Sequence, residues 1–245
     1  MVHVWAQKGD RESKKADTKA PTDIDSPKNL VTDRVTENTA TISWDPVQAV
    51  IDKYMVRYTS ADGDTREVSV GKEQSGTILT GLRPGVEYMV QVWAQKGTQE
   101  SKRADTKAPT DIDSPTNLVT ERVTEDTATI SWDPVQAIID KYMVRYISAD
   151  GDTREVSVGK EQSSTVLTGL RPGAEYTVQV WAQKGDRESK KANTKAPTEI
   201  DPPQNLVTDR VTEDTATISW DPVRAVIDKY MVRYTSADGD TQEVS

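Results

Sequence analysis

Few residues of this sequence could take part in covalent or acid–base chemistry, since it contains one histidine, His3, and no cysteine. A Ser-His-Asp triad or a histidine metal site therefore cannot recur along the chain, and no thiolate can bind a metal. We expect a protein that is not an enzyme, with no cofactor and no bound metal. Recognition by charge remains: Lys184-Gly185-Asp186-Arg187 and Lys8-Gly9-Asp10-Arg11 each place a basic and an acidic residue around a glycine.

Both charged segments follow a stretch that predicts a β-strand. Residues 82–97 and 170–185 begin with a Pro-Gly corner and nearly repeat each other. Tyr88, Val90, Val92 and Ala94 then alternate with more polar neighbours, the period of a half-buried strand. The stretch ends in a glycine loop, and this loop carries the charged residues.

The chain repeats itself with a period of 88 residues, shown by Trp44, Trp132 and Trp220. This period suits a small independent β domain and is too long for a solenoid unit. We expect complete repeats at 26–110 and 114–198, a partial repeat of two strands at 1–20 and another of four strands at 202–245. The joints near Pro21, Pro109 and Pro197 predict stiff, extended connectors.

The pattern within each repeat predicts an all-β fold, a seven-stranded antiparallel β-sandwich, and the chain repeats this sandwich in tandem. Strands are expected near residues 29–35, 39–44, 54–58, 66–70, 77–79, 87–94 and 102–106, separated by turn residues and without helical periodicity. Alternation places Trp44, Tyr54, Leu82 and Tyr88 in the core. The partial repeats are too small to fold readily alone, so we expect either disordered ends or mutual completion, including head-to-tail self-association between chains.

Three motifs resemble the fibronectin type III family across the whole chain: residues 42–46, 54–58 and 82–88. Residues 26–39 are further similar to tenascin repeats. The resemblance implies a secreted, extracellular-matrix protein whose arrays space its ends and engage cell-surface receptors. In such domains this glycine loop can present Arg-Gly-Asp to integrins, with the acidic side chain completing a metal site on the receptor.

The resemblance makes Lys184, Gly185, Asp186, Arg187, Lys8, Gly9 and Asp10 candidates for receptor binding. Compared with Arg-Gly-Asp, Lys-Gly-Asp keeps the positive charge but lacks the planar guanidinium group that can bind a carboxylate through two hydrogen bonds. The first complete repeat has Lys96-Gly97-Thr98, which lacks the acidic residue, and should not bind the receptor through this loop. The alternative is an ordinary polar loop that uses glycine for its backbone freedom.

Other candidates have simpler alternatives. Trp93 and Trp181 point outward and could anchor an interface, although a long side chain such as Arg57 or Lys102 can cover such a ring. Asp62 with Asp64 could suggest calcium, but the loop is short and a hairpin turn is favoured. Lys102-Arg103 and Lys190-Lys191 predict a solvated strand, with weak binding of a heparin-like polysaccharide as the alternative.

The net charge of −9 argues against a nucleic-acid partner. The sequence has no apolar run long enough to insert into a membrane. No signal peptide is visible at its N-terminus. A structural array whose loops bind nothing, or an accessory array of a larger receptor or secreted enzyme, remains an alternative to an adhesion module.

Overall fold

The computed structural model describes residues 1–19 and 22–245, and every regular element among them is a β-strand. The connector expected around Pro21 lies outside the described residues. The chain divides into two compact units, residues 1–111 and 112–245. No helix in the described part of the chain is long and apolar enough to cross a membrane.

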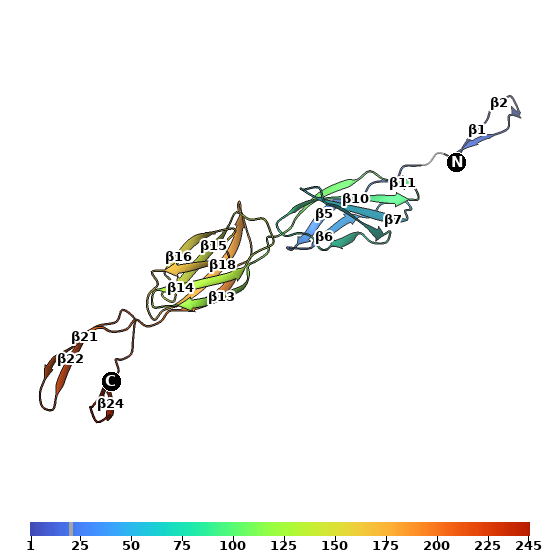
Figure 1. Ribbon diagram of the computed structural model, residues 1–245. Coiled ribbons are helices and arrows are strands. Elements are labelled where there is room, and N and C mark those ends of the chain that lie inside the picture. Colours follow the sequence, from blue (N-terminus) through green and yellow to red (C-terminus); the bar gives the residue numbers. More distant parts are fainter. Residues whose placement is uncertain (20–21) are drawn as a thin grey trace. The chain divides into compact units, whose positions relative to one another are not determined.

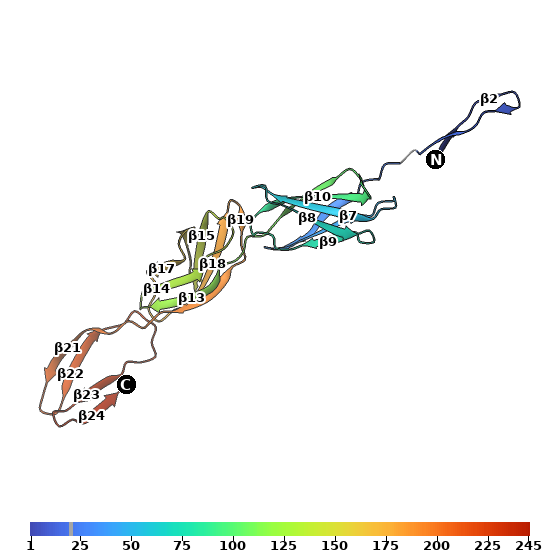
Figure 2. The same cartoon turned by 45° about the vertical axis from the view of Figure 1, so that its right-hand side comes forward.

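The first unit contains a complete sandwich of two antiparallel sheets (Figures 1 and 2). One sheet has the order β5-β6-β9, and the other has the order β11-β10-β7-β8 with β12 also paired to β10. Its strands are β5 (Lys28–Val35), β6 (Ala40–Asp45), β7 (Lys53–Ser60), β8 (Thr65–Gly71), β9 (Gly76–Leu79), β10 (Glu87–Lys96), β11 (Gln99–Glu100) and β12 (Ala104–Pro109). The predicted all-β antiparallel sandwich is present, with the short β11 as an eighth strand beside the seven expected.

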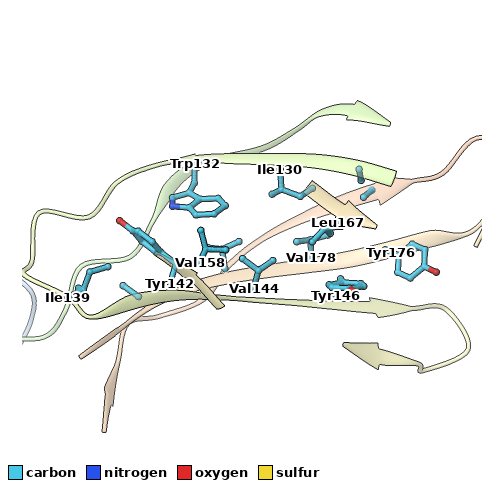
Figure 3. Close-up of a cluster of buried hydrophobic side chains, with 14 of the residues drawn as sticks. Ile130, Trp132, Ile139, Tyr142, Val144, Tyr146, Val158, Leu167, Tyr176 and Val178 are labelled. Atoms are coloured by element: carbon cyan, nitrogen blue, oxygen red, sulfur yellow. The ribbon is translucent and has the colours of Figure 1, made fainter. Parts of the chain in front are cut away.

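The second unit contains the same sandwich, with sheets β13-β14-β17 and β16-β15-β18-β19, and with β20 on β18. Its strands are β13 (Thr116–Val123), β14 (Thr127–Asp133), β15 (Lys141–Ser148), β16 (Thr153–Gly159), β17 (Ser164–Thr168), β18 (Glu175–Lys184), β19 (Arg187–Glu188) and β20 (Ala192–Pro197). The core lies between the two sheets, as Figure 3 shows for Trp132, Tyr142, Val144 and Leu167.

Alternating apolar residues build each core from the facing sides of the two sheets. Tyr142 and Val144 are 1% and 0% exposed, and Trp132 packs edge to face on Tyr142 with ring centroids 5.3 Å apart. Burial of such side chains contributes roughly 1.5–3 kcal/mol each. A core of this kind explains how the fold is held together in a chain without cysteine.

One region differs from the expectation. The stretch of residues 82–97 was expected to end in a glycine loop, whereas β10 and β11 form a tight hairpin in which Lys96 pairs with Gln99. The reason is the backbone of Gly97, whose φ of 55° lets a two-residue turn close the hairpin. The corresponding hairpin of the second repeat, in which Lys184 pairs with Arg187, carries the candidate receptor site.

Residues 1–19 form a hairpin whose two arms are each interrupted. Two strands were expected, and four short ones are present: β1 (Val2–Val4) pairs with β4 (Ala16–Thr18), and β2 (Gln7–Lys8) pairs with β3 (Arg11–Glu12). His3 contacts the carboxylate of Asp17 across this hairpin.

Residues 204–244 form the four strands expected there, in two separate two-stranded sheets. These are β21 (Gln204–Val211), β22 (Ala216–Asp221), β23 (Val232–Thr235) and β24 (Thr241–Val244). Between them lies an open cavity of ≈ 380 Å³ lined in part by Leu206, Trp220 and Tyr234. Tyr234 is 53% exposed, whereas its equivalent Tyr146 in the complete repeat is 6% exposed.

The connector that begins at Thr198 is fixed by hydrogen bonds on both sides. The Thr198 hydroxyl donates to the carbonyl of Arg171 at 2.6 Å and accepts the N–H of Ala174 at 2.8 Å. Three residues later, the carboxylate of Asp201 accepts the N–H groups of Arg224 at 2.8 Å and Ala225 at 2.9 Å. Side chains of the connector thus pair with backbone groups of the residues before and after it.

Candidate functional site

The Lys-Gly-Asp segment of the second repeat forms the tip of the β18–β19 hairpin. Lys184 pairs with Arg187, so Gly185 and Asp186 alone make the turn. Gly185 has a φ of 55° and Asp186 has a negative φ, the pattern of a type II′ turn with glycine at its first central position. Asp186 is exposed at the tip and Lys184 is half-buried beside it.

A carboxylate from the neighbouring loop holds this turn. The N–H of Gly185 donates to Oδ2 of Asp140 at 2.7 Å, and the N–H of Asp140 donates to the carbonyl of Gln183 at 2.9 Å. The side-chain amide of Gln183 also donates to the carbonyl of Gly185, at 3.3 Å. Asp140 thus contacts the end of β18 and the turn that follows it.

The first repeat contains the same arrangement around Gly97. Its N–H donates to Oδ2 of Asp52 at 2.7 Å, and the N–H of Asp52 donates to Gln95 at 2.9 Å. Position 98 is an exposed threonine, so this turn offers no acidic side chain. It is a second copy of the scaffold without the candidate ligand.

The hairpin at residues 7–12 has the same kind of glycine turn. Lys8 pairs with Arg11, Gly9 has a φ of 60°, and Asp10 is exposed at the tip. The side chain of Gln7 donates to the carbonyl of Gly9 at 3.3 Å. The Lys-Gly-Asp tripeptide is thus present at the tip of this hairpin as well.

The two candidate interface tryptophans are covered by cationic side chains. Trp93 is 2% exposed, with the guanidinium carbon of Arg103 4.3 Å and that of Arg57 5.5 Å from its ring centroid. Trp181 is also 2% exposed, between Arg145 at 5.4 Å and Lys191 at 4.4 Å. The covered arrangement is the one present, with Arg103 rather than Lys102 as the second partner of Trp93.

The paired aspartates of the β7–β8 and β15–β16 hairpins serve the turns. Asp62 accepts a hydrogen bond from the Arg83 guanidinium at 2.6 Å and contacts the Ser60 hydroxyl. The bond from Arg83 is the main cause, and that from Ser60 the second, of a lowered pKa of Asp62. The Ser148 hydroxyl and Arg171 together lower the pKa of Asp150 to about 2. Within the described residues, no group of three or more His, Cys, Asp or Glu side chains could hold a metal ion.

The basic pairs near the last strands are mixed with acidic groups. Arg103 and Lys191 lie over the tryptophan rings, and nearby Asp105 accepts a bond from Gln91 at 2.9 Å. Lys102 and Lys190 are exposed, and the hydroxyls of Ser101 and Ser189 bond to their carbonyls at 2.9 Å. This arrangement gives little room for a continuous cationic surface.

Sequence reasoning missed the anchoring residues Asp52 and Asp140. Each lies 45 residues before the glycine that it holds, directly after a buried isoleucine, Ile51 or Ile139. No local pattern connects positions so far apart in the chain. The one signal was that the same aspartate recurs at the same place in both complete repeats.

Two facing antiparallel sheets, a tyrosine near the start of β10 and β18, and exposed turns at the ends of the sheets define a modular β-sandwich of the kind that presents loops to partners. The fibronectin type III domain matches residues 25–107, 113–195 and 201–245. The chain therefore belongs to the fibronectin type III family.

Tenascins are among the similar proteins. The chain is 81% identical to human Tenascin-N over 99% of its own length, and 76% identical to mouse Tenascin-N, also over 99%. It spans 19% and 16% of the lengths of these relatives. The predicted similarity to tenascin repeats, and among them to tenascin-N (tenascin-W), is confirmed.

A solved structure supports the same assignment. The two-domain fibronectin type III segment of chicken tenascin superposes with a TM-score of 0.63 at 32% sequence identity, covering 71% of this chain and 100% of that one. At this sequence identity, the two proteins share sequence features of the family as well as the β-sandwich fold.

Proposed function

We propose that this chain is a non-enzymatic adhesion and spacer segment of a secreted extracellular-matrix protein, and that it engages integrins through its Lys-Gly-Asp turns. The domain division proposed for it is a partial repeat at 1–20, complete repeats at 26–110 and 114–198, and a partial repeat at 202–245. The similarity to Tenascin-N and to tenascin repeats supports the matrix assignment. Integrins and other cell-surface or matrix proteins are the proposed partners.

The observation that carries the receptor proposal is the exposure of Asp186 on an ordered turn. A carboxylate can complete the coordination of a divalent cation bound to a receptor, since hard cations prefer oxygen ligands. Lys184 and Arg187 flank Asp186 as a paired position of the hairpin and supply positive charge on either side of it. The turn thus offers an acidic ligand between basic residues.

Cell attachment to surfaces coated with the whole chain tests this proposal. We expect Asp186→Ala to reduce attachment, Asp10→Ala to reduce it less, and the double variant to abolish it. Thr98→Ala, at the same turn position of the first repeat, is the matched control and should attach cells like the parent. Equal attachment by the double variant and the parent would reject the receptor proposal.

A spacer array without receptor binding is the second candidate, and the bonds of Thr198 and Asp201 favour it because they hold a connector in one conformation. An accessory array of a larger receptor or secreted enzyme would share this feature. Complete absence of cell attachment by the parent chain would favour these alternatives.

Two weaker interactions belong to the same proposal. Binding of a heparin-like polysaccharide would use Lys102, Lys190 and their neighbours, and should vanish at moderate salt because exposed charges are screened. Head-to-tail self-association would bring the hairpin of residues 1–19 to the open cavity of residues 204–244. Sedimentation over a range of concentrations checks it, and a monomer at every concentration would reject it.

A further inference from the structure

We infer that Asp140 is a positioning residue of the proposed receptor-binding turn, and that residues 52–100 contain the same scaffold without its acidic ligand. The inference rests on the proposed function, because it concerns the presentation of Asp186 to a cation-bearing cell-surface receptor. It is carried by bonds that connect the core of the repeat to the turn.

The chain of contacts begins in the core. Ile139 is 5% exposed and packs in the hydrophobic cluster, so the backbone next to it is fixed. Asp140 follows at once and directly precedes β15, the strand that pairs with β18. Its carboxylate therefore starts from a rigid part of the sandwich.

Asp140 then makes two bonds to the hairpin that carries the turn. Its N–H donates to the carbonyl of Gln183 at 2.9 Å, and its Oδ2 accepts the N–H of Gly185 at 2.7 Å. A bond to a charged acceptor is stronger than one between neutral groups. The second bond fixes the peptide group between Lys184 and Gly185, at the start of the turn that presents Asp186.

Gly185 is needed because its φ is positive, and not because a side chain at this position would clash. A Cβ added at Gly185 would meet nothing within 4 Å, while the φ of +55° is a conformation that other residues rarely adopt. The turn is therefore held by its backbone conformation and by Asp140. A turn held in one conformation before binding avoids the entropic cost of ordering it on the receptor.

The two complete repeats separate the acidic ligand from the anchor. Residues 183–187 have both, whereas residues 95–99 have the anchor Asp52 but Thr98 in the place of the ligand. Of these two turns, we expect only residues 183–187 to bind the receptor.

Removal of the anchor in the whole chain tests the role of Asp140. In the Asp10→Ala background, we expect Asp140→Ala to raise the coating concentration for half-maximal cell attachment about three- to tenfold, which is the size of effect that loss of one hydrogen bond predicts. Asp140→Asn, which keeps an acceptor oxygen, should lose less. Hydrogen exchange of the Gly185 amide, measured by NMR in the absence of any receptor, should be faster in Asp140→Ala than in the parent.

The outcomes separate this inference from the proposed function. Loss of attachment in Asp186→Ala combined with unchanged attachment in Asp140→Ala would overturn the inference and leave the receptor site standing. Unchanged exchange at Gly185 in Asp140→Ala would overturn it as well. An Asp186→Ala variant that attaches like its parent would instead reject the proposed function.

A gain of function tests the scaffold in the first repeat. In the Asp10→Ala, Asp186→Ala background, the substitutions Thr98→Asp and Gln99→Arg make residues 96–99 identical to 184–187. We expect attachment to return to within about threefold of that given by residues 184–187, and adding Asp52→Ala should weaken it again about three- to tenfold. No return of attachment, or equal attachment with and without Asp52, would overturn the inference.

Discussion

The hydroxyl of Tyr88 accepts the backbone N–H of Arg83 at 2.9 Å, and so closes the corner at the start of β10. In the second repeat Tyr176 accepts from Arg171 at 3.0 Å. The strand that begins at this bond ends at the glycine turn, so the two ends of one element have different tasks. The tyrosine bond stabilises the corner, and the turn presents side chains to solvent.

Tyr88→Phe should destabilise the first repeat by about 1 kcal/mol, because it removes the acceptor of a half-buried N–H without changing the packing of the ring. Urea denaturation of the full chain measures this. Tyr234→Phe is the control, since its hydroxyl bonds to the exposed side chain of Gln242, and it should change stability by a few tenths of a kcal/mol at most. Equal effects of the two variants would contradict a special role for the corner.

The covered tryptophans give a second prediction. Arg103→Ala should increase acrylamide quenching of tryptophan fluorescence and cost about 0.5–1 kcal/mol, because the guanidinium carbon lies 4.3 Å from the centroid of Trp93. Arg103→Lys should be close to the parent, since the second repeat has Lys191 at 4.4 Å from Trp181. Quenching and stability that are unchanged in the alanine variant would show that the cation does not cover the ring.

The corner at Tyr88 was predictable from the sequence, and the covering of Trp93 was predictable only in part. The spacing of Tyr88 from Leu82, Pro84 and Gly85 in the sequence indicated a corner. Alternation placed Trp93 outside the core, and its position on the outer side of the sheet is compatible with 2% exposure only because Arg57 and Arg103 enclose it. Binary patterning describes which face a residue is on and does not describe how long side chains on that face fold over it.

Acid should weaken the first repeat partly through Asp25. The N–H of Gln48, and after it that of Ala49, lower the pKa of Asp25, while burial opposes them. The folded pKa is below that of the unfolded chain, so the stabilising contribution is present above about pH 4 and is lost as the pH falls through the lowered folded value.

The corresponding measurement compares Asp25→Asn with the parent by urea denaturation at about pH 5 and about pH 2. The parent should be more stable than the variant at the higher pH, and the gap should narrow at the lower one because Asp25 becomes protonated. A gap of the same size at both values would contradict the assigned role of the carboxylate.

A fourth prediction concerns the connector at Thr198. Gly173 has a φ of +64°, and an added Cβ would lie 3.0 Å from the Cβ of Ala225 and 3.5 Å from Cγ1 of Ile200. Gly169 has nearly the same φ, +66°, but its added Cβ would meet only the end of the flexible Arg154 side chain. Both alanine variants therefore bear a backbone cost, and Gly173→Ala also crowds the connector.

We expect Gly173→Ala to destabilise the protein by about 1 kcal/mol more than Gly169→Ala. It should also accelerate amide exchange at Ala225, whose N–H bonds to Asp201. Thermal denaturation and NMR exchange measure the two effects. Identical stability and exchange in the two glycine variants would show that the close approach at Gly173 does not tighten the connector.

The candidate site itself was predictable only as a tripeptide. The sequence placed Lys184, Gly185 and Asp186 after a strand, whereas the tight turn and its anchor depend on Asp140, which lies far away in the chain. A carboxylate that reaches a turn from the neighbouring strand of the same sheet leaves no local pattern, since its position is set by the pairing of β15 with β18. Such contacts follow from the fold and cannot be read from neighbouring residues.

Direct binding of purified integrin ectodomains to the immobilised chain tests the receptor site without the complexity of cells. The chain should bind at least one integrin in the presence of a divalent cation, lose binding on chelation, and lose most of it in Asp186→Ala while Thr98→Ala binds like the parent. Binding by the Asp10→Ala, Asp186→Ala variant that equals the parent, or binding that persists after chelation, would contradict a carboxylate–cation contact at the Lys-Gly-Asp turns.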